Sequence, residues 1–388
     1  MGRSQKGVGE FAPPRRGLLV GNYCHDVLIR DREVVAETLG GAASFISVVH
    51  ASLSIQCEYV SKVGSDFAYF DSLDHKPIVS SSAPTTLFRA QFGRSSSDHD
   101  DENGRSDRIL KRAHACESIR ASDLPEDRFD FGLAVGVGGE ILPETLQKML
   151  DICAVVFADI QALIRSFDSC GTVSLTELKE SGFYHLLPRL SFLKASTEEA
   201  LKMDVDEVRR MCCVVVTNGK EGCTVYNKDL EMKIAPFLAV QVDPTGAGDS
   251  FLGGFAAGLV QGLSVPDAAL LGNLFGSLAV QYVGLPDIDS SLVQRINNEV
   301  QRRKSECSFI HNVNESKFAK QPGHEQFHLS LCAALRHPDR SPPQLSNDLR
   351  SIPRDLKSQY QELEAPSLHT HHLINDAAIP AVKDHTTH

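Results

Sequence analysis

The sequence predicts an α/β fold in which helices cover both faces of a mainly parallel central sheet. Two observations lead to this prediction. From Gly17 to about Cys307, short apolar runs typical of buried strands alternate with segments whose apolar residues repeat at helical spacing. Several of these runs end in glycine-containing turns that lead into the next helical segment. Parallel strands are joined by helical crossovers, so this alternation favours a sheet between two helical layers.

The expected elements follow this rhythm along the chain. Residues 16–29 are expected to form a strand, a turn and a second strand, and residues 40–53 a glycine turn followed by a helix. Further strands are expected at 129–138, 154–161, 190–195, 211–219, 223–227 and 235–242, and further helices at 142–153 and 252–263.

Residues 77–117 break this alternation. The run TTLFRAQF, which ends at Phe92, alternates like an exposed strand, whereas Arg94 to Arg108 is polar and contains glycine. We therefore expect a small β lid with a flexible loop, inserted in a main domain of residues 17–307.

The two ends of the chain differ from this domain. Residues 1–16 are basic and have no apolar core, so a flexible N-terminus is expected rather than a secretory signal. Beyond about residue 307 proline, serine, histidine and charged residues dominate without periodicity. Residues 308–388 are therefore expected to be mostly disordered, with solvated rather than metal-bound histidines.

Composition and charge exclude several classes of protein. Of the 388 residues, 42% are hydrophobic and 23% charged, a mixture typical of soluble globular proteins. The net charge of -11 argues against a general nucleic-acid or anionic-membrane binder, and no apolar run approaches the roughly 20 residues of a membrane span. The ten cysteines include no C-x-x-C pair and suit a reducing compartment, so a cytoplasmic location is expected. The oligomeric state is left open.

The stretch VDPTGAGDSF, from Val242 to Phe251, predicts an anion-binding turn at the start of a helix. Glycine permits backbone angles that let the N–H groups of Gly246, Ala247 and Gly248 point at one spot, and the helix N-terminus adds partial positive charge. Asp249 is itself an anion, and one interpretation is that it only satisfies the helix dipole. The other is that the turn holds a phosphoryl group while Asp249 takes the proton from an attacking alcohol.

The sequence does not match two other nucleotide-binding signatures. The chain contains no G-x-x-x-x-G-K-[ST] motif, so a nucleotide site of the P-loop type is excluded. The glycine turn at Gly136 follows a predicted strand, but Ile141 replaces the third glycine of G-x-G-x-x-G and no clear ribose-binding acid follows, so a dinucleotide oxidoreductase is not favoured. Asp159, Gln161 and Arg165 follow a strand end, where α/β proteins bind ligands, and their role is left open.

Several motifs together resemble the PfkB, or ribokinase-like, family of carbohydrate kinases. VDPTGAGDSFLGGF is similar to the family signature D-T-x-G-A-G-D-x-F. Further family motifs are matched in the usual order by VGNYCHD, Gly40-Gly41, VSKVGSD, SFLKASTEEA and VVVTNGKEG. The resemblance covers residues 17 to about 305. It implies a ribokinase-like fold with a small β lid and ATP-dependent phosphorylation of an alcohol.

The resemblance also implies roles for individual residues. It implies Asp249 as the catalytic base and Gly246, Ala247 and Gly248 as the binding site of the phosphoryl charge. It implies that the substrate binds at Asp26, Gly40 and Gly41. It implies that ATP lies against Ser196, Thr217, Gly219, Asn273 and the turn from Gly246 to Asp249. It implies that Glu199 contacts Mg²⁺ indirectly, through phosphate or water, and that Asp243 with loop carbonyls is a candidate site for a monovalent cation such as K⁺.

Each of these residues also has a plain structural interpretation. The alternative for Asp26 is to cap a turn, and the alternative for Glu199 is a capping box with Ser196. Thr217 and Gly219 would suit a hairpin turn, and Asn273 would suit a satisfied amide in a buried helix.

Three departures from the family pattern affect the expected substrate and phosphate contacts. Pro244 replaces the usual threonine and removes one N–H from the loop, and Ser196 replaces the usual asparagine. Phe45 stands where ribokinases carry a sugar-binding asparagine, which makes ribose a poor candidate. Taken together, these motifs most resemble the branch of the family that phosphorylates the 3-hydroxyl of myo-inositol for phytate synthesis. The alternatives are another sugar or nucleoside kinase, or a catalytically idle interaction protein of this family.

Overall fold

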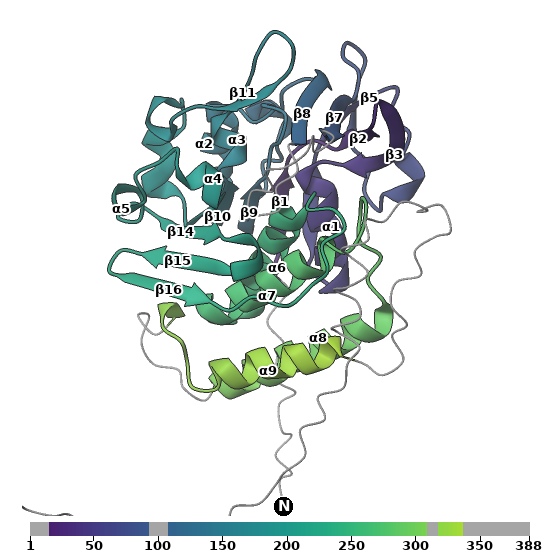
Figure 1. The fold of residues 1–388 in the computed structure, drawn as a ribbon. Helices are drawn as coiled ribbons and strands as arrows, with labels where there is room; N and C mark the ends of the chain where they lie inside the picture. The colour runs from purple at the N-terminus through teal and green to yellow at the C-terminus, as the bar shows by residue number, and fades with distance from the viewer. Residues whose placement is uncertain (1–14, 93–107, 309–316, 337–388) are drawn as a thin grey trace, which may run out of the picture. The chain divides into compact units, whose positions relative to one another are not determined.

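An eight-stranded sheet forms the centre of the computed structural model, which describes residues 15–92, 108–308 and 317–336 (Figure 1). Its strands are β1 (Gly17–Val20), β4 (Cys57–Val60), β9 (Phe129–Ala134), β10 (Cys153–Asp159), β13 (Phe192–Ser196), β14 (Cys213–Thr217), β15 (Cys223–Asn227) and β16 (Leu230–Ile234). The order across the sheet is β16-β15-β14-β13-β10-β9-β1-β4. The strands from β14 to β4 run parallel, and β15 and β16 extend the sheet in antiparallel pairs. The predicted mainly parallel sheet is confirmed.

Helices lie on both faces of this sheet. One layer contains α1 (Ala42–Ser52), α6 (Ala247–Gln261) and α7 (Val265–Ala279), with α8 (Ser290–Ser308) and α9 (His324–Leu335) packed outside it. The other layer contains α2 (Pro143–Ile152), α3 (Gln161–Ile164), α4 (Thr197–Ala200) and α5 (Val205–Val208). In β1, Leu19 joins the apolar cluster of the first layer, whereas Leu18 and Val20 join that of the second. This alternation is what a strand buried on both faces requires.

The lid is a four-stranded sheet that combines two distant parts of the chain. Its strands are β2 (Cys24–Arg30), β3 (Glu33–Gly40), β7 (Thr86–Phe92) and β8 (Arg108–His114), in the order β3-β2-β7-β8. β2 and β3 form a hairpin, and β2 pairs in parallel with β7. The lid therefore extends beyond the predicted range of 77–117, because half of its strands come from residues 24–40.

Two small strand pairs border the lid. They are β5 (Lys62–Gly64) with β6 (Ile78–Ser80), and β11 (Arg165–Phe167) with β12 (Val173–Leu175). A bridge between Lys111 and Thr172 joins β8 to the second of these pairs. The lid is thereby connected to the region that follows the end of β10.

The prediction of a strand at 235–242 is wrong, because this segment is irregular. Pro236 has no N–H to give to a strand ladder. The side-chain amide of Asn273 instead donates hydrogen bonds to the carbonyls of Ile234 and Ala235, at 3.3 and 2.8 Å. The N–H of Val242 donates to the carbonyl of Val280 at 2.7 Å. Groups from α7 and its C-terminal end thus satisfy a backbone that alternation alone assigned to a sheet.

A packed helix lies within the segment that was expected to be disordered. α9 begins after Gly323, whose φ of +83° is left-handed, and it buries Phe327 and Leu331 completely. These two residues are four positions apart, so they lie on one face of the helix. The predicted domain boundary at residue 307 is therefore corrected for residues 317–336. The other predictions for the N-terminus, the loop and the tail concern residues 1–14, 93–107, 309–316 and 337–388, which lie outside the described residues.

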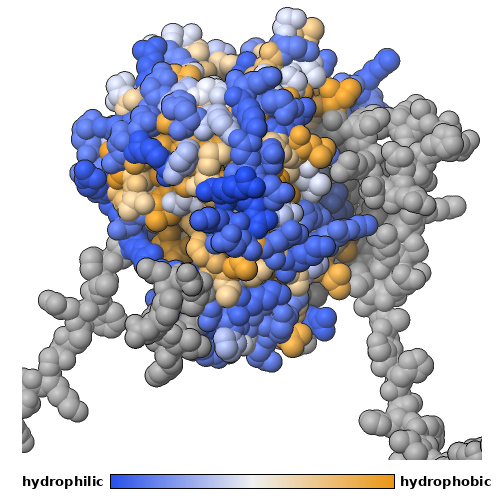
Figure 2. All heavy atoms as spheres, turned by 90° about the vertical axis from the view of Figure 1, so that its left-hand side faces the viewer, coloured by the Kyte–Doolittle hydropathy of each residue, from blue (hydrophilic) through white to orange (hydrophobic). Residues whose placement is uncertain are grey.

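Figure 2 shows the face of the protein that is on the left in Figure 1. Hydrophilic side chains dominate this face, and apolar residues occur between them in separate groups. Among the helices in the described ranges, none is long and apolar enough to cross a membrane.

Candidate active site

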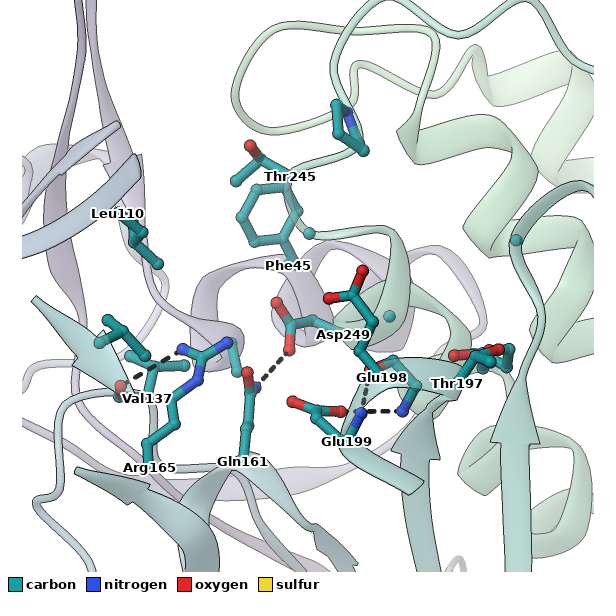
Figure 3. Close-up of a pocket in the computed structure, with 18 of the residues that line it drawn as sticks. Phe45, Leu110, Val137, Gln161, Arg165, Thr197, Glu198, Glu199, Thr245 and Asp249 are labelled. Atoms are coloured by element: carbon teal, nitrogen blue, oxygen red, sulfur yellow. Dashed lines mark hydrogen bonds between the residues drawn. The ribbon is translucent and has the colours of Figure 1, made fainter. Parts of the chain in front are cut away.

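A cavity of about 1460 Å³ lies between the carboxyl ends of the central strands and the lid (Figure 3). The central sheet contributes Lys194, Ser196 and Thr217 to its lining, α3 contributes Gln161, and the lid contributes Asp26, Phe88 and Leu110. The N-terminal turn of α6 completes the wall with Gly246, Gly248 and Asp249. The cavity therefore connects the predicted substrate residues to the predicted ATP residues through the glycine turn.

The glycine turn caps α6 as the sequence predicts. Gly246 is the N-cap with a left-handed φ of +75°. A β-carbon at this position would lie only 2.1 Å from the ring of Phe45. Glycine is therefore required at residue 246 both for its backbone angles and for the close packing of Phe45 behind the turn. The turn lies at a helix N-terminus, which is a suitable site for an anion, and the N–H of Ala247 also donates to the carbonyl of Pro244 at 3.3 Å.

Asp249 lies in the first turn of α6 and faces the cavity. Its Oδ1 accepts a hydrogen bond of 3.0 Å from the side-chain amide of Gln161. Although one side faces the cavity, protein atoms surround the carboxylate closely, and this burial raises its pKa. The charges of Lys194 and Arg165 and the Gln161 hydrogen bond oppose the rise. Asp249 is thus a carboxylate at the turn whose proton affinity exceeds that of an exposed aspartate.

A buried ion pair lies at the base of the cavity. Asp159 and Lys194 are register partners on the adjacent strands β10 and β13, and Lys194 Nζ lies 3.0 Å from Asp159 Oδ2. Their exposed fractions are 0% and 5%. Burial raises the pKa of Asp159 to about 7, against the opposing effect of Lys194. Burial alone would lower the pKa of Lys194. The negative charges of Asp159, Glu199 and Asp249 outweigh this effect and raise the pKa, so Lys194 remains charged.

Sequence reasoning missed Lys194, although the strand SFLKAS offered a signal. A lysine in an apolar strand, two residues before its polar end, is rare unless the charge is paired. The sequence left the roles of Gln161 and Arg165 open, and the structure brings both into the cavity wall.

On the substrate side, the structure places Asp26 and Gly41 at the cavity. A β-carbon at Gly40 would lie 2.1 Å from the Asp26 carboxylate, so Gly40 leaves the space that this side chain occupies. Gly41 is the N-cap of α1 with a φ of +87°, and a β-carbon there would lie 2.5 Å from the carbonyl oxygen of Asn22. Phe45 follows in α1, and its ring is in the cavity wall beside the glycine turn. Gly40 therefore affects the cavity indirectly, because its lack of a side chain leaves room for the Asp26 carboxylate.

On the opposite side, Ser196 and Glu199 form the capping box that the sequence allowed. The Ser196 side chain accepts a hydrogen bond from the N–H of Glu199 at 3.2 Å, and Glu199 Oε2 accepts one from the N–H of Ser196 at 2.8 Å. Both residues also line the cavity. Burial acts to raise the pKa of Glu199, but Lys194 and the Ser196 hydrogen bonds outweigh it, so the pKa is lowered. Glu199 is therefore a charged carboxylate at the cavity wall as well as a cap.

The remaining predicted ATP residues separate into two groups. Thr217, at the end of β14, and Gly219, with a φ of +57°, both line the cavity. Asn273 is not one of the lining residues in the described part of the chain. It is buried in α7 and holds the carbonyls of Ile234 and Ala235, which is the structural interpretation left open for it.

The family model of pfkB carbohydrate kinases matches residues 173–290, which include the glycine turn. An inositol 3-kinase from Arabidopsis thaliana is 58% identical over 83% of this chain and 88% of its own length. An inositol 3-kinase from Oryza sativa subsp. japonica is 49% identical over 85% of each chain.

Solved structures share the fold at lower identity. A pyrophosphate-dependent kinase of the ribokinase family, complexed with a pyrophosphate analogue and myo-inositol, aligns with a TM-score of 0.59 and 15% identity over 70% of this chain and 97% of its own. The nucleoside kinase of Methanocaldococcus jannaschii aligns with a TM-score of 0.54 and 20% identity over 76% of this chain and all of its own. The glycine turn, the carboxylate beside it, the ribokinase-like fold and the extended identity to these relatives together establish that the chain belongs to the pfkB family of carbohydrate kinases.

Proposed function

We propose that this kinase transfers the terminal phosphoryl group of ATP to a hydroxyl of myo-inositol and forms myo-inositol 3-phosphate. The observation that carries the proposal is the position of Asp249 beside the glycine turn, in one cavity with Asp26. The substrate is supported by the relatives from Arabidopsis thaliana and rice, both named inositol 3-kinase and both matched over more than four-fifths of this chain.

In the proposed reaction Asp249 is the general base. A hydroxyl oxygen of the substrate attacks the terminal phosphorus of ATP, its proton passes to the Asp249 carboxylate, and ADP leaves. The raised pKa of Asp249 suits this role, since a base is most effective when its pKa lies near the working pH. The N–H groups of Gly246, Ala247 and Gly248 stabilise the negative charge on the phosphoryl oxygens.

ATP is proposed to extend from the glycine turn along the wall formed by Ser196, Thr217 and Gly219. Mg²⁺ usually binds to one or two carboxylates together with substrate phosphates, and the charged Glu199 carboxylate in this wall fits an indirect contact, through phosphate or water. Mg²⁺ would neutralise part of the charge that develops on the phosphates. Asp243, which precedes the turn and accepts hydrogen bonds from Thr245, is our candidate for a monovalent cation such as K⁺.

Myo-inositol is proposed to bind between Asp26 and the lid. The carboxylate of Asp26 supplies acceptors for adjacent hydroxyls, and the ring of Phe45 offers an apolar surface to the C–H groups of a cyclohexane ring. Phe88 and Leu110 close this side of the cavity. A site with such paired polar and apolar groups rejects ligands that leave its polar atoms unpaired.

We further propose a cytoplasmic enzyme that supplies phytate synthesis. Nine of the ten cysteines, those whose side chains the structure describes, are free thiols, which suits a reducing compartment. The place in phytate synthesis rests on the resemblance to inositol 3-kinases.

An ADP-release assay across myo-inositol, ribose, fructose and adenosine tests the proposal. We expect myo-inositol to exceed the others by at least ~10²-fold in kcat/KM, a discrimination that hydrogen-bonding sites readily reach. NMR of the product should place the phosphate at the 3-position. Turnover of fructose or adenosine without turnover of myo-inositol would contradict the substrate, and no ADP release with any acceptor would contradict the enzyme.

A further inference from the structure

Lys194 lies against the glycine turn at Gly248. A β-carbon at Gly248 would lie 2.6 Å from Lys194 Nζ, so the absence of a side chain at residue 248 lets the ammonium group approach the backbone of the turn. Lys194 also lines the cavity although its side chain is almost fully buried. The cation is therefore close to the place where the transferred phosphoryl group is proposed to bind.

The position of this cation is fixed by its partner. Asp159 is completely buried at the end of β10, and the strand register places it opposite Lys194 on β13. An ammonium group has three N–H donors, and in the described structure one of them is directed at Asp159 Oδ2. The stem of Lys194 is thereby held between two strands, and its charge is presented at the turn.

Three carboxyl groups and two cations surround the turn. Carboxylates come from β10 (Asp159), α4 (Glu199) and α6 (Asp249), and all three affect the titration of Lys194. The other cation that acts on Asp249 is Arg165 of β11, and Gln161 of α3 contributes a neutral hydrogen bond. A donor with several phosphate charges would enter a site that already holds three carboxylates and two cations.

We propose that Lys194, positioned by Asp159, supplies the fixed positive charge of the phosphoryl-transfer site. The charge stabilises ionised Asp249 and offsets the negative charge of the donor phosphates at the glycine turn. It acts as a preorganised charge in a low-dielectric site, where such groups have their largest effect. This inference rests on the proposed phosphoryl transfer at Asp249 but does not depend on which alcohol is the acceptor.

A purely structural ion pair is the alternative. Replacing a buried pair with uncharged residues of similar volume is often neutral for stability, whereas removing one partner leaves an unpaired charge. The double variant K194M/D159N therefore removes the charge of Lys194 without leaving Asp159 unpaired. The single variant K194Q is a second route, because its amide still donates a hydrogen bond towards Asp159.

The experiment measures melting temperature and steady-state kinetics with the alcohol that the wild type turns over fastest. We expect K194Q to lose ~10²–10³-fold in kcat, the size of effect seen when one preorganised donor is lost. We expect K194M/D159N to fold with a melting temperature near that of the wild type and to remain at least about tenfold below it in kcat. A folded variant of either kind with kcat within tenfold of the wild type overturns the inference.

The pH profile provides a readout that a structural role would not move. Asp249 must be ionised to accept a proton, so kcat/KM falls as the pH is lowered through its pKa. Loss of the neighbouring cation makes ionised Asp249 less stable, so the rising limb of the profile should move to higher pH in K194Q. An unchanged limb overturns the proposed action on Asp249.

K62M/D123N is a matched control, since Lys62 is 7% exposed at its side chain and lies 2.7 Å from Asp123, outside the cavity wall. This variant should keep wild-type kcat.

If no alcohol is turned over, the proposed function fails, and calorimetry still tests the role of Lys194. The affinity for MgATP should then fall at least tenfold in K194Q, with a smaller change for MgADP, and equal affinities in variant and wild type would overturn the inference.

Discussion

The side-chain amide of Gln161 donates a 3.0 Å hydrogen bond to Asp249, and this bond joins the start of α3 to the first turn of α6. The two residues are 88 positions apart in the sequence. The contact fixes the direction of the carboxylate at the glycine turn (Figure 3). The proposed base is therefore held by a group from the opposite wall of the cavity.

D249N should abolish turnover while leaving the affinity for ATP within several-fold of the wild type. Asparagine keeps the shape of the side chain but cannot accept the proton, and general-base catalysis contributes ~10²–10⁴-fold. Steady-state kinetics and calorimetry test this prediction, with D206N at an exposed site in α5 as the control. A D249N enzyme with more than a tenth of wild-type kcat would show that another group accepts the proton.

L331A should destabilise the protein by about 2–5 kcal/mol, because α9 buries this leucine completely. L329A, on the same helix at 60% exposure, should change the free energy of unfolding by less than about 0.5 kcal/mol. Denaturant unfolding of both variants measures the difference. Equal effects would mean that α9 does not pack on the domain in solution. That result would agree with the disorder that the sequence alone predicted for this segment.

R303M should cost about 3–5 kcal/mol of stability, because it removes the main cation beside a buried carboxylate. Arg303 is 1% exposed and bonds Asp267 on α7 through Nε and Nη2, both at 2.9 Å. Its Nη1 also donates to the carbonyl of Pro322 at 2.6 Å, which ties the start of α9 to α8. R302M removes only partly exposed ion pairs from the neighbouring position and should cost at most about 1 kcal/mol. Similar losses in both variants would argue against a role for Asp267 in docking α9.

The stability of the protein should fall in acid in part through His50. This residue is buried in α1, neither ring nitrogen has a hydrogen-bond partner in the described structure, and burial lowers its pKa to about 3. The unfolded chain binds a proton at His50 below about pH 6.5, whereas the folded protein does not, so the contribution is complete above pH 6.5 and is lost as the pH falls towards 3.

Between pH 7.5 and 5.0 this single group should account for about 2 kcal/mol of lost stability. H50L has no group that titrates at this position, so it should not lose this stability. Between pH 7.5 and 5.0 the unfolding free energy of H50L should therefore rise by that amount relative to the wild type. Urea unfolding at the two pH values measures it. A difference that is independent of pH would mean that His50 is not kept neutral by the fold.

The fold class and the centre of the active site could be predicted from the sequence because their signals are local. The alternation of apolar runs specifies parallel strands with helical crossovers, and the glycines of VDPTGAGDSF specify a turn that opens a helix. Asp249 is one residue beyond that turn, so its place at a helix N-terminus follows from chain connectivity alone. Asp26 was assigned through the resemblance of VGNYCHD to a family motif, and the structure places it at the cavity.

Other features depend on contacts that adjacent residues do not specify. Residues 235–242 alternate like a strand, but groups from α7 and its C-terminal end take their backbone hydrogen bonds. α9 has little apolar periodicity in the sequence, yet Arg303 and the buried face of α7 give it a place to pack. In each case the deciding partner lies tens of residues away.

The sequence by itself determined the sheet, the helix-opening turn and the carboxylate beside it, because backbone geometry and side-chain periodicity act over a few residues. Only the tertiary structure decided that Lys194 faces Asp159 and the glycine turn, that Gln161 holds Asp249, and that the lid draws half of its strands from residues 24–40. These arrangements depend on strand order and register. Burial then makes the pairing of charges obligatory, since an unpaired buried charge is strongly unfavourable, but which residues meet is decided by the assembled fold.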